Sequence, residues 1–169
     1  VTSEYYKDTN IADYWIYTGG ASTEQIENLK NVEGIADLNT SMAITVKYKD
    51  EKDNENNPSL KLRTLSDSDS ISLFLLQEGS EFSEAYEDSV WLDLNFAREH
   101  NINVGDRIVI SYMTMEKELT VKGLVLSSEY IYYTGSTTEI VPNHYLYGYC
   151  FTSEKTIKNF LGKTIINEI

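Results

Sequence analysis

The chain has 169 residues, of which 41% are hydrophobic, and a formal net charge of −13 at pH 7. This length and composition allow a buried core and exclude disorder as the default state. The charge repels phosphate backbones and anionic lipid surfaces, which excludes nucleic acid as an expected partner, whereas it could attract a cationic peptide or simply keep the surface soluble.

The first predicted elements form a strand–helix–strand unit. An apolar run at 14–18 predicts a strand, and a pair of glycines then separates it from a helix at 23–30. Ser22 followed by Gln25 three residues later fits a capping box at the start of this helix. A second apolar stretch at 34–38 completes the unit.

A β-hairpin is predicted next. Apolar residues alternate with polar ones along 42–48 and again along 60–65, as expected for two half-buried strands that pair. The residues between them, 50–58, are mostly acidic and amide side chains and offer no apolar side chain to bury, which indicates a solvated loop. Their spacing does not match a calcium-binding loop, and no glycine supplies its sharp turn.

The middle of the chain is predicted to be mainly β. An apolar strand at 71–77 is followed by a helix at 93–100 and a tight turn at 104–106. The strand that leaves this turn, 107–112, should pair with 117–127 as an antiparallel hairpin.

The end of the chain repeats the pattern of its beginning, with a strand at 148–152, a helix at 154–161 and an apolar stretch at 164–169. We therefore predict an α+β fold in which two βαβ-like units form one layer and the helices 23–30 and 154–161 lie side by side on one sheet face. The predicted division is a discontinuous α+β subdomain, 1–58 and 146–169, and an inserted, mainly antiparallel β subdomain, 59–145.

Residues that carry chemistry are scarce. Cys150 is the only cysteine, so it can form no internal disulfide, and its apolar neighbours predict a small buried residue. His100 at a helix end and His144 in an aromatic loop do not have the spacing of metal ligands. There is no nucleophile elbow, phosphate-binding loop or dinucleotide fingerprint. We expect neither an enzyme nor a cofactor or metal site.

Tyrosines cluster late in the sequence and have two interpretations. Amphipathic rings on a loop can form a protein or glycan contact surface, or they can pack the loop against the sheet. The alternation of tyrosines at 145, 147 and 149 favours packing. The candidate surface for a partner or substrate is Glu129, Tyr130, Tyr132, Tyr133 and Tyr145.

Five motifs, in this order and spacing, resemble one family. They are ADYWIY at 12–17, VEGI at 32–35, WLD with FA and VGD between 91 and 106, VKGLV at 121–125, and SSEYIY at 127–132. Together they resemble the extracytoplasmic domain of FtsX-like ABC transporter permeases, a group whose members include proteins with a MacB-like periplasmic core domain.

The resemblance implies an extracellular or periplasmic domain between two membrane helices, with a polar helix at 1–8 leading from the first and the chain after Ile169 returning to the second. The given chain would then be a soluble excised piece of a protein of the cell membrane. The resemblance also implies a cytoplasmic ABC ATPase as partner. The domain would couple ATPase-driven motion to the binding or release of a peptide, lipoprotein or cell-wall factor, and it would have no catalytic residue. The alternative, suggested by Trp91 and the tyrosines, is a secreted or surface-anchored binding module with glycans as the candidate ligand. A hydrolase with dispersed residues is a weaker third interpretation.

Overall fold

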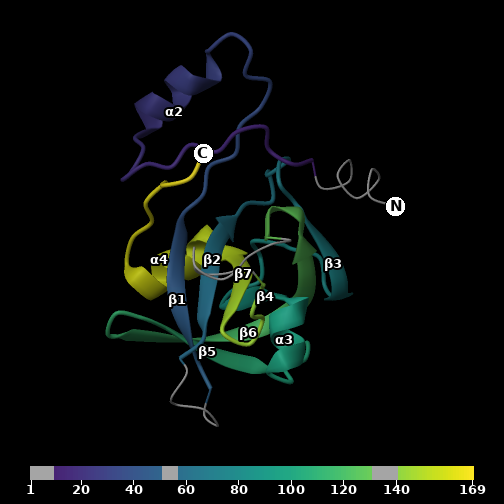
Figure 1. The fold of residues 1–169 in the computed structure, drawn as a ribbon. Coiled ribbons are helices and arrows are strands. Elements are labelled where there is room, and N and C mark those ends of the chain that lie inside the picture. Colours follow the sequence, from purple (N-terminus) through teal and green to yellow (C-terminus); the bar gives the residue numbers. More distant parts are fainter. Residues whose placement is uncertain (1–9, 51–56, 131–140) are drawn as a thin grey trace.

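The structure, a computed structural model, describes residues 10–50, 57–130 and 141–169. Seven strands and short helices account for its regular elements (Figure 1). In chain order they are α2 (Thr23–Lys30), β1 (Ala43–Lys49), β2 (Ser59–Leu65), β3 (Phe74–Gly79), β4 (Ser89–Asp93), α3 (Leu94–Glu99), β5 (Arg107–Tyr112), β6 (Met115–Ser127), the 3-10 turn η1 (Ser128–Tyr130), β7 (Tyr147–Ser153) and α4 (Glu154–Leu161).

The strands close into a small mixed barrel. Their order is β3-β6-β4-β7-β2-β1-β5, and β5 also pairs with β6, so the six strands from β6 to β5 form a ring with β3 attached outside it. The 13-residue strand β6 makes this closure, because its first half pairs antiparallel with β5 and its second half pairs parallel with β4. β2 and β7, which are distant in the sequence, are joined by a parallel pairing that runs from Ser59↔Tyr147 to Leu65↔Ser153.

The predicted α+β fold with two βαβ-like units is therefore wrong. Residues 14–18 and 34–38 form no strand, and Tyr17 makes only an isolated bridge to Glu168. The two helices do not lie side by side on one sheet face. The helix α2 lies outside the barrel (Figure 1) and has Ile26 as its one buried residue. The helix α4, in contrast, packs against the barrel through Ile157 and Phe160. A helix with so little apolar surface cannot form half of a layer.

Several local predictions are confirmed. β1 and β2 form the expected antiparallel hairpin, and β5 and β6 form the second one. The helix at 23–30 begins with the predicted capping box, in which the Ser22 hydroxyl and the Gln25 side chain each accept a hydrogen bond from the other residue's backbone N–H. The barrel takes β1 and β7 from the ranges 1–58 and 146–169 and its other strands from 59–145; the division into two subdomains at those boundaries stays a prediction.

Two apolar cores lie on opposite faces of the sheet. The interior of the barrel is filled by alternate strand residues, among them Val46, Leu60, Leu62, Val90, Leu92, Ile110, Leu119 and Val121. A smaller outer core contains Leu65, Trp91, Val125, Tyr149 and Phe151, and Phe74 of β3 and Phe82 pack over it. Because β4 and β7 contribute to both cores, nearly every residue of these two strands is buried.

The contact of Gly148 with Phe96 gives a test of the barrel interior. A Cβ at Gly148 would lie 2.7 Å from three atoms of the Phe96 side chain, which itself is fully buried. We predict that Gly148→Ala lowers the free energy of unfolding by about 1 to 3 kcal/mol, because added volume in a packed core forces side chains from their preferred rotamers. Urea denaturation measures this. The control is Gly19→Ala, whose Cβ would have no atom within 4 Å; equal stability of the two variants would contradict the packing described.

Candidate functional site

The two ends of the described chain meet at one end of the molecule. Ile16 and Ile169 exchange two backbone hydrogen bonds of 2.8 and 3.0 Å, and the Thr18 N–H donates to the Asn167 carbonyl at 3.0 Å. On its other side this C-terminal segment pairs with Ser41, and the Asn167 side chain donates to the Ala43 carbonyl and accepts from the Ala43 N–H. Residues 167–169 therefore lie between the N-terminal arm, residues 10–18, and the start of β1.

Two cations of β2 lie beneath this junction. Lys61 and Arg63 project from the face of β2 opposite Leu60 and Leu62, and Glu168 pairs with both of them. The Lys61 Nζ lies 2.8 Å from Glu168 Oε1 and the Arg63 Nε lies 3.6 Å from Oε2. The Arg63 and Glu168 side chains are only 3% and 4% exposed, so their charges are largely removed from water and depend on each other.

The N-terminal arm rests on the same cations. The Trp15 ring lies 4.3 Å from the Arg63 guanidinium carbon, and the Tyr17 ring lies 5.7 Å from the Lys61 Nζ, both distances typical of cation–π contacts. Trp15 Nε1 also donates to Glu129 Oε2 at 3.0 Å. We call Trp15, Ser41, Lys61, Arg63, Glu129 and Glu168 the chain-end cluster.

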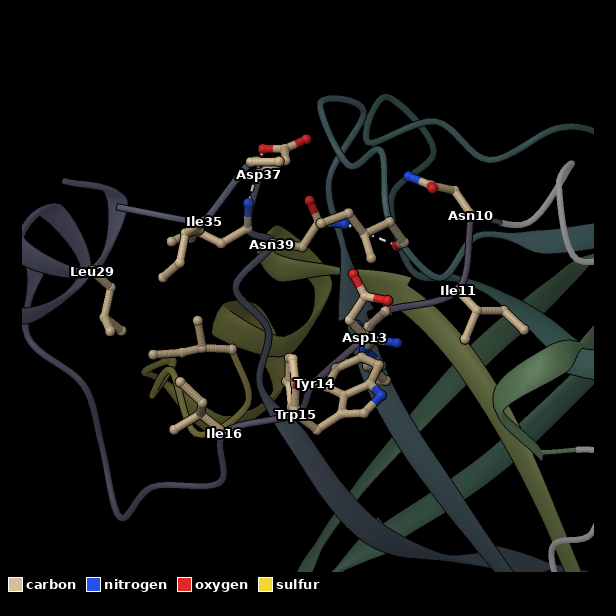
Figure 2. A pocket seen from close by; sticks show the side chains of 17 residues that line it. Asn10, Ile11, Asp13, Tyr14, Trp15, Ile16, Leu29, Ile35, Asp37 and Asn39 are labelled. Atoms are coloured by element: carbon tan, nitrogen blue, oxygen red, sulfur yellow. Dashed lines mark hydrogen bonds between the residues drawn. The ribbon is translucent and has the colours of Figure 1, made fainter. Parts of the chain in front are cut away.

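An open cavity of about 600 Å³ lies beside this cluster. Figure 2 shows its side chains, which come from the N-terminal arm, from α2 and from the loop at 34–39. Most of the walls are apolar, with Trp15, Ile16, Leu29 and Ile35 among the labelled residues, and Asp13 and Asp37 provide carboxylates. Hydrogen bonds from the Ser70 hydroxyl and the Leu38 N–H lower the pKa of Asp37. Arg63 and Ile169 also line the cavity.

The residues of the predicted partner surface lie in different places. Glu129 belongs to the chain-end cluster, where its Oε1 also accepts a 2.6 Å hydrogen bond from Ser72. Tyr130 stacks on Tyr149 with ring centroids 4.7 Å apart, and burial raises the pKa of its phenol. Tyr145 stacks instead on His100, at 4.5 Å. Tyr132 and Tyr133 lie outside the described residues. A role of any of these residues in partner binding stays a prediction.

Two of the three residues considered for metal or thiol chemistry, His100 and Cys150, are packed inside the protein. The His100 ring has its Nε2 2.8 Å from the Tyr145 carbonyl and lies against Phe96 and Tyr48. Cys150 is buried, as predicted, and its burial raises the pKa of the thiol. Within the described ranges, no three His, Cys, Asp or Glu side chains are grouped so as to hold a metal ion.

Sequence reasoning missed the cations of the chain-end cluster. The alternation along 60–65 places Lys61 and Arg63 on one face, and an alternating polar face ordinarily meets solvent. The segment that covers them comes from the ends of the chain, more than a hundred residues away in the case of Glu168. The available signal was Trp15, which was interpreted as part of a strand, although an aromatic ring is also a frequent cover for a guanidinium.

The comparisons with known proteins define the fold. No family model and no curated protein matches the sequence. The fold is also found in the extracellular domain of an ABC-type transporter. A similar solved structure is the extracellular domain of the noncanonic ABC-type transporter YknZ from Gram-positive bacteria, with 12% sequence identity, a TM-score of 0.57, and coverage of 91% of this chain and 79% of that one.

No helix among residues 10–50, 57–130 and 141–169 has the length and apolar character needed to cross a bilayer.

Asp93 is a buried carboxyl at the end of β4. It caps α3, accepting a 3.0 Å hydrogen bond from the Asn95 N–H, and its side chain is buried. Burial raises the pKa of Asp93 to about 6, although the Asn95 N–H and the nearby His144 favour the charged form. The folded protein therefore keeps a proton that the unfolded chain, with a pKa of about 3.9, has already lost.

This shift predicts a pH dependence of stability. A raised carboxyl pKa contributes stability at low pH that is lost as the pH rises from about 4 through about 6, and the loss amounts to about 3 kcal/mol. Asp93→Asn removes the titration and keeps a good capping residue. We predict that this variant gains stability relative to the wild type between pH 4 and pH 7.

Urea denaturation across that pH range measures the difference. Asp106→Asn is the matched control, because Asp106 also accepts a backbone hydrogen bond, from Asn103, but is exposed. A stability difference between Asp93→Asn and wild type that stays constant with pH would contradict the prediction.

Proposed function

We propose that this chain is the extracytoplasmic domain of an FtsX-like ABC transporter permease with a MacB-like periplasmic core. In this role it couples membrane-helix motion, driven by a cytoplasmic ATPase, to the binding or release of an extracytoplasmic substrate or partner. The observation that carries the proposal is the fold shared with the extracellular domain of YknZ over 91% of the chain. The order of the sequence motifs from 12 to 132 supports the FtsX-like and MacB-like part of the proposal.

The geometry of the chain ends supports this role. The arm at 16–18 and the segment at 167–169 are hydrogen-bonded neighbours, so both connections to the domain lie at one end of the molecule. A domain inserted between two consecutive membrane helices needs this arrangement. A movement of either helix would reach the domain through the chain-end cluster.

The expected partners follow from this proposal. They are a cytoplasmic ABC ATPase, which acts through the membrane region, and a peptide, lipoprotein or cell-wall factor on the outer face. The role is mechanical and needs no catalytic residue, so we propose that the domain is not an enzyme. A glycan-binding module gains little support, because Trp91, which suggested it, is 0% exposed and packs against Phe82 in the outer core.

Membrane topology tests the proposal in the full-length protein. Met113 lies between β5 and β6 and is 84% exposed, whereas the native Cys150 is buried. With any cysteine outside residues 1–169 replaced by serine, we predict that Met113→Cys reacts with a membrane-impermeant maleimide on intact cells. Detergent-solubilised full-length protein should copurify with an ABC ATPase.

The wild-type background, in which only Cys150 remains, is the control and should stay unlabelled until the protein is denatured. Labelling of Met113→Cys only after cell lysis would place the domain on the cytoplasmic side and refute the proposal. Full-length protein that an alkaline wash releases from membranes would favour the secreted or surface-anchored alternative.

A further inference from the structure

We propose that Glu168 is a latch that docks both ends of the chain on the barrel, so that the N-terminal arm and the C-terminal segment attach and detach as one unit. The inference concerns residues 10–18 and 165–169 and does not rest on the proposed function. In this role the charge of the Glu168 side chain, and not only the backbone hydrogen bonds of this residue, positions the two segments.

Glu168 is the electrostatic partner of both cations. Among the described residues, Glu168 is the only acid within ion-pair distance of either Lys61 or Arg63. Ser41 extends the arrangement, since its hydroxyl donates to Glu168 at 3.4 Å and accepts from Arg63 Nε at 3.2 Å. Without the Glu168 charge, a buried guanidinium would keep no carboxylate partner, which is strongly unfavourable.

The Arg63 guanidinium has little access to water. Arg63 is 3% exposed, and the Trp15 ring lies over it at 4.3 Å. Trp15 belongs to the N-terminal arm, so hydration of the guanidinium face that its ring covers requires the arm to move. Neutralising an acid of the C-terminal segment should in this way release an arm that is distant from it in sequence.

Backbone hydrogen bonds link the two segments. Ile16 and Ile169 are hydrogen-bonded to each other, so the arm loses its strand partner when the C-terminal segment leaves. Ser72 also holds the arm, through hydrogen bonds with Asn10 and Ala12, and it is hydrogen-bonded to Glu129 as well. If these contacts alone were sufficient, the arm would stay docked without Glu168.

Detachment would change the cavity. Trp15, Ile16, Arg63 and Ile169 all line it, and each belongs to the latch or to a segment that the latch holds. The closed latch therefore forms part of the cavity wall, and opening it would remove the wall that faces Leu29 and Ile35. The latch sets whether the apolar cavity described above exists.

Hydrogen exchange of the chain measured by mass spectrometry tests the latch. Glu168→Gln keeps the shape of the side chain and removes its charge. We predict that exchange at the amides of Ile16, Thr18 and Ile169 accelerates by on the order of 100-fold. The amides of β2 and β7 in the barrel should keep their wild-type exchange rates.

Two further variants sharpen the experiment. Glu27→Gln is the matched control, because it breaks an ion pair with Lys30 on the exposed face of α2 and should change neither segment. Trp15→Leu removes the cover of Arg63 without altering the barrel interior and should accelerate exchange in both segments, even if Glu168→Gln fails to fold.

Three results would overturn the inference. Acceleration confined to residues 167–169 would show that the segments detach independently. Unchanged exchange in Glu168→Gln would show that the backbone hydrogen bonds suffice. Equal acceleration throughout the barrel would make Glu168 a contact for general stability.

Discussion

The architecture depends on the closure of the sheet by β6. This strand is 13 residues long and pairs with β5 along its first half and with β4 and β3 along its second. Closure satisfies backbone groups that would otherwise form open edges and encloses an apolar interior. It also determines that β3 must lie outside the ring, where it covers the outer core around Trp91. The other features of the molecule are arranged on this frame.

The chain-end cluster is a consequence of that frame. β2 has a parallel partner in β7 and an antiparallel one in β1, so one of its faces lines the barrel and the other faces outward with Lys61 and Arg63. In an open sheet such a face would meet water. Here the two ends of the chain lie across it, and Glu168 together with the rings of Trp15 and Tyr17 replaces the water that these cations lose.

The sequence predicted the parts of the fold that depend on neighbours along the chain. The β1–β2 and β5–β6 hairpins follow from alternation and short connections, and the helix at 23–30 follows from Ser22 and Gln25. The β2–β7 and β4–β6 pairings join distant segments in parallel, and local pattern carries no information about which distant strands meet. The same limit explains why the chain-end cluster was not predicted. Lys61 and Arg63 were recognisable as one polar face of a strand, but the distant segments that cover this face were not. Glu129 was predicted to belong to a partner surface, which stays a prediction, but its hydrogen bond from Trp15 could not be read from the sequence.

The adjacency of the ends has a consequence for the connectivity of the chain. Since Ile16 and Ile169 are hydrogen-bonded to each other, the backbone from Ile16 to Ile169 follows a nearly closed circle. In such a protein the order in which the strands are encoded is not fixed by the architecture, and circular permutants that begin at an exposed turn, such as the one at Met113, should have the same fold.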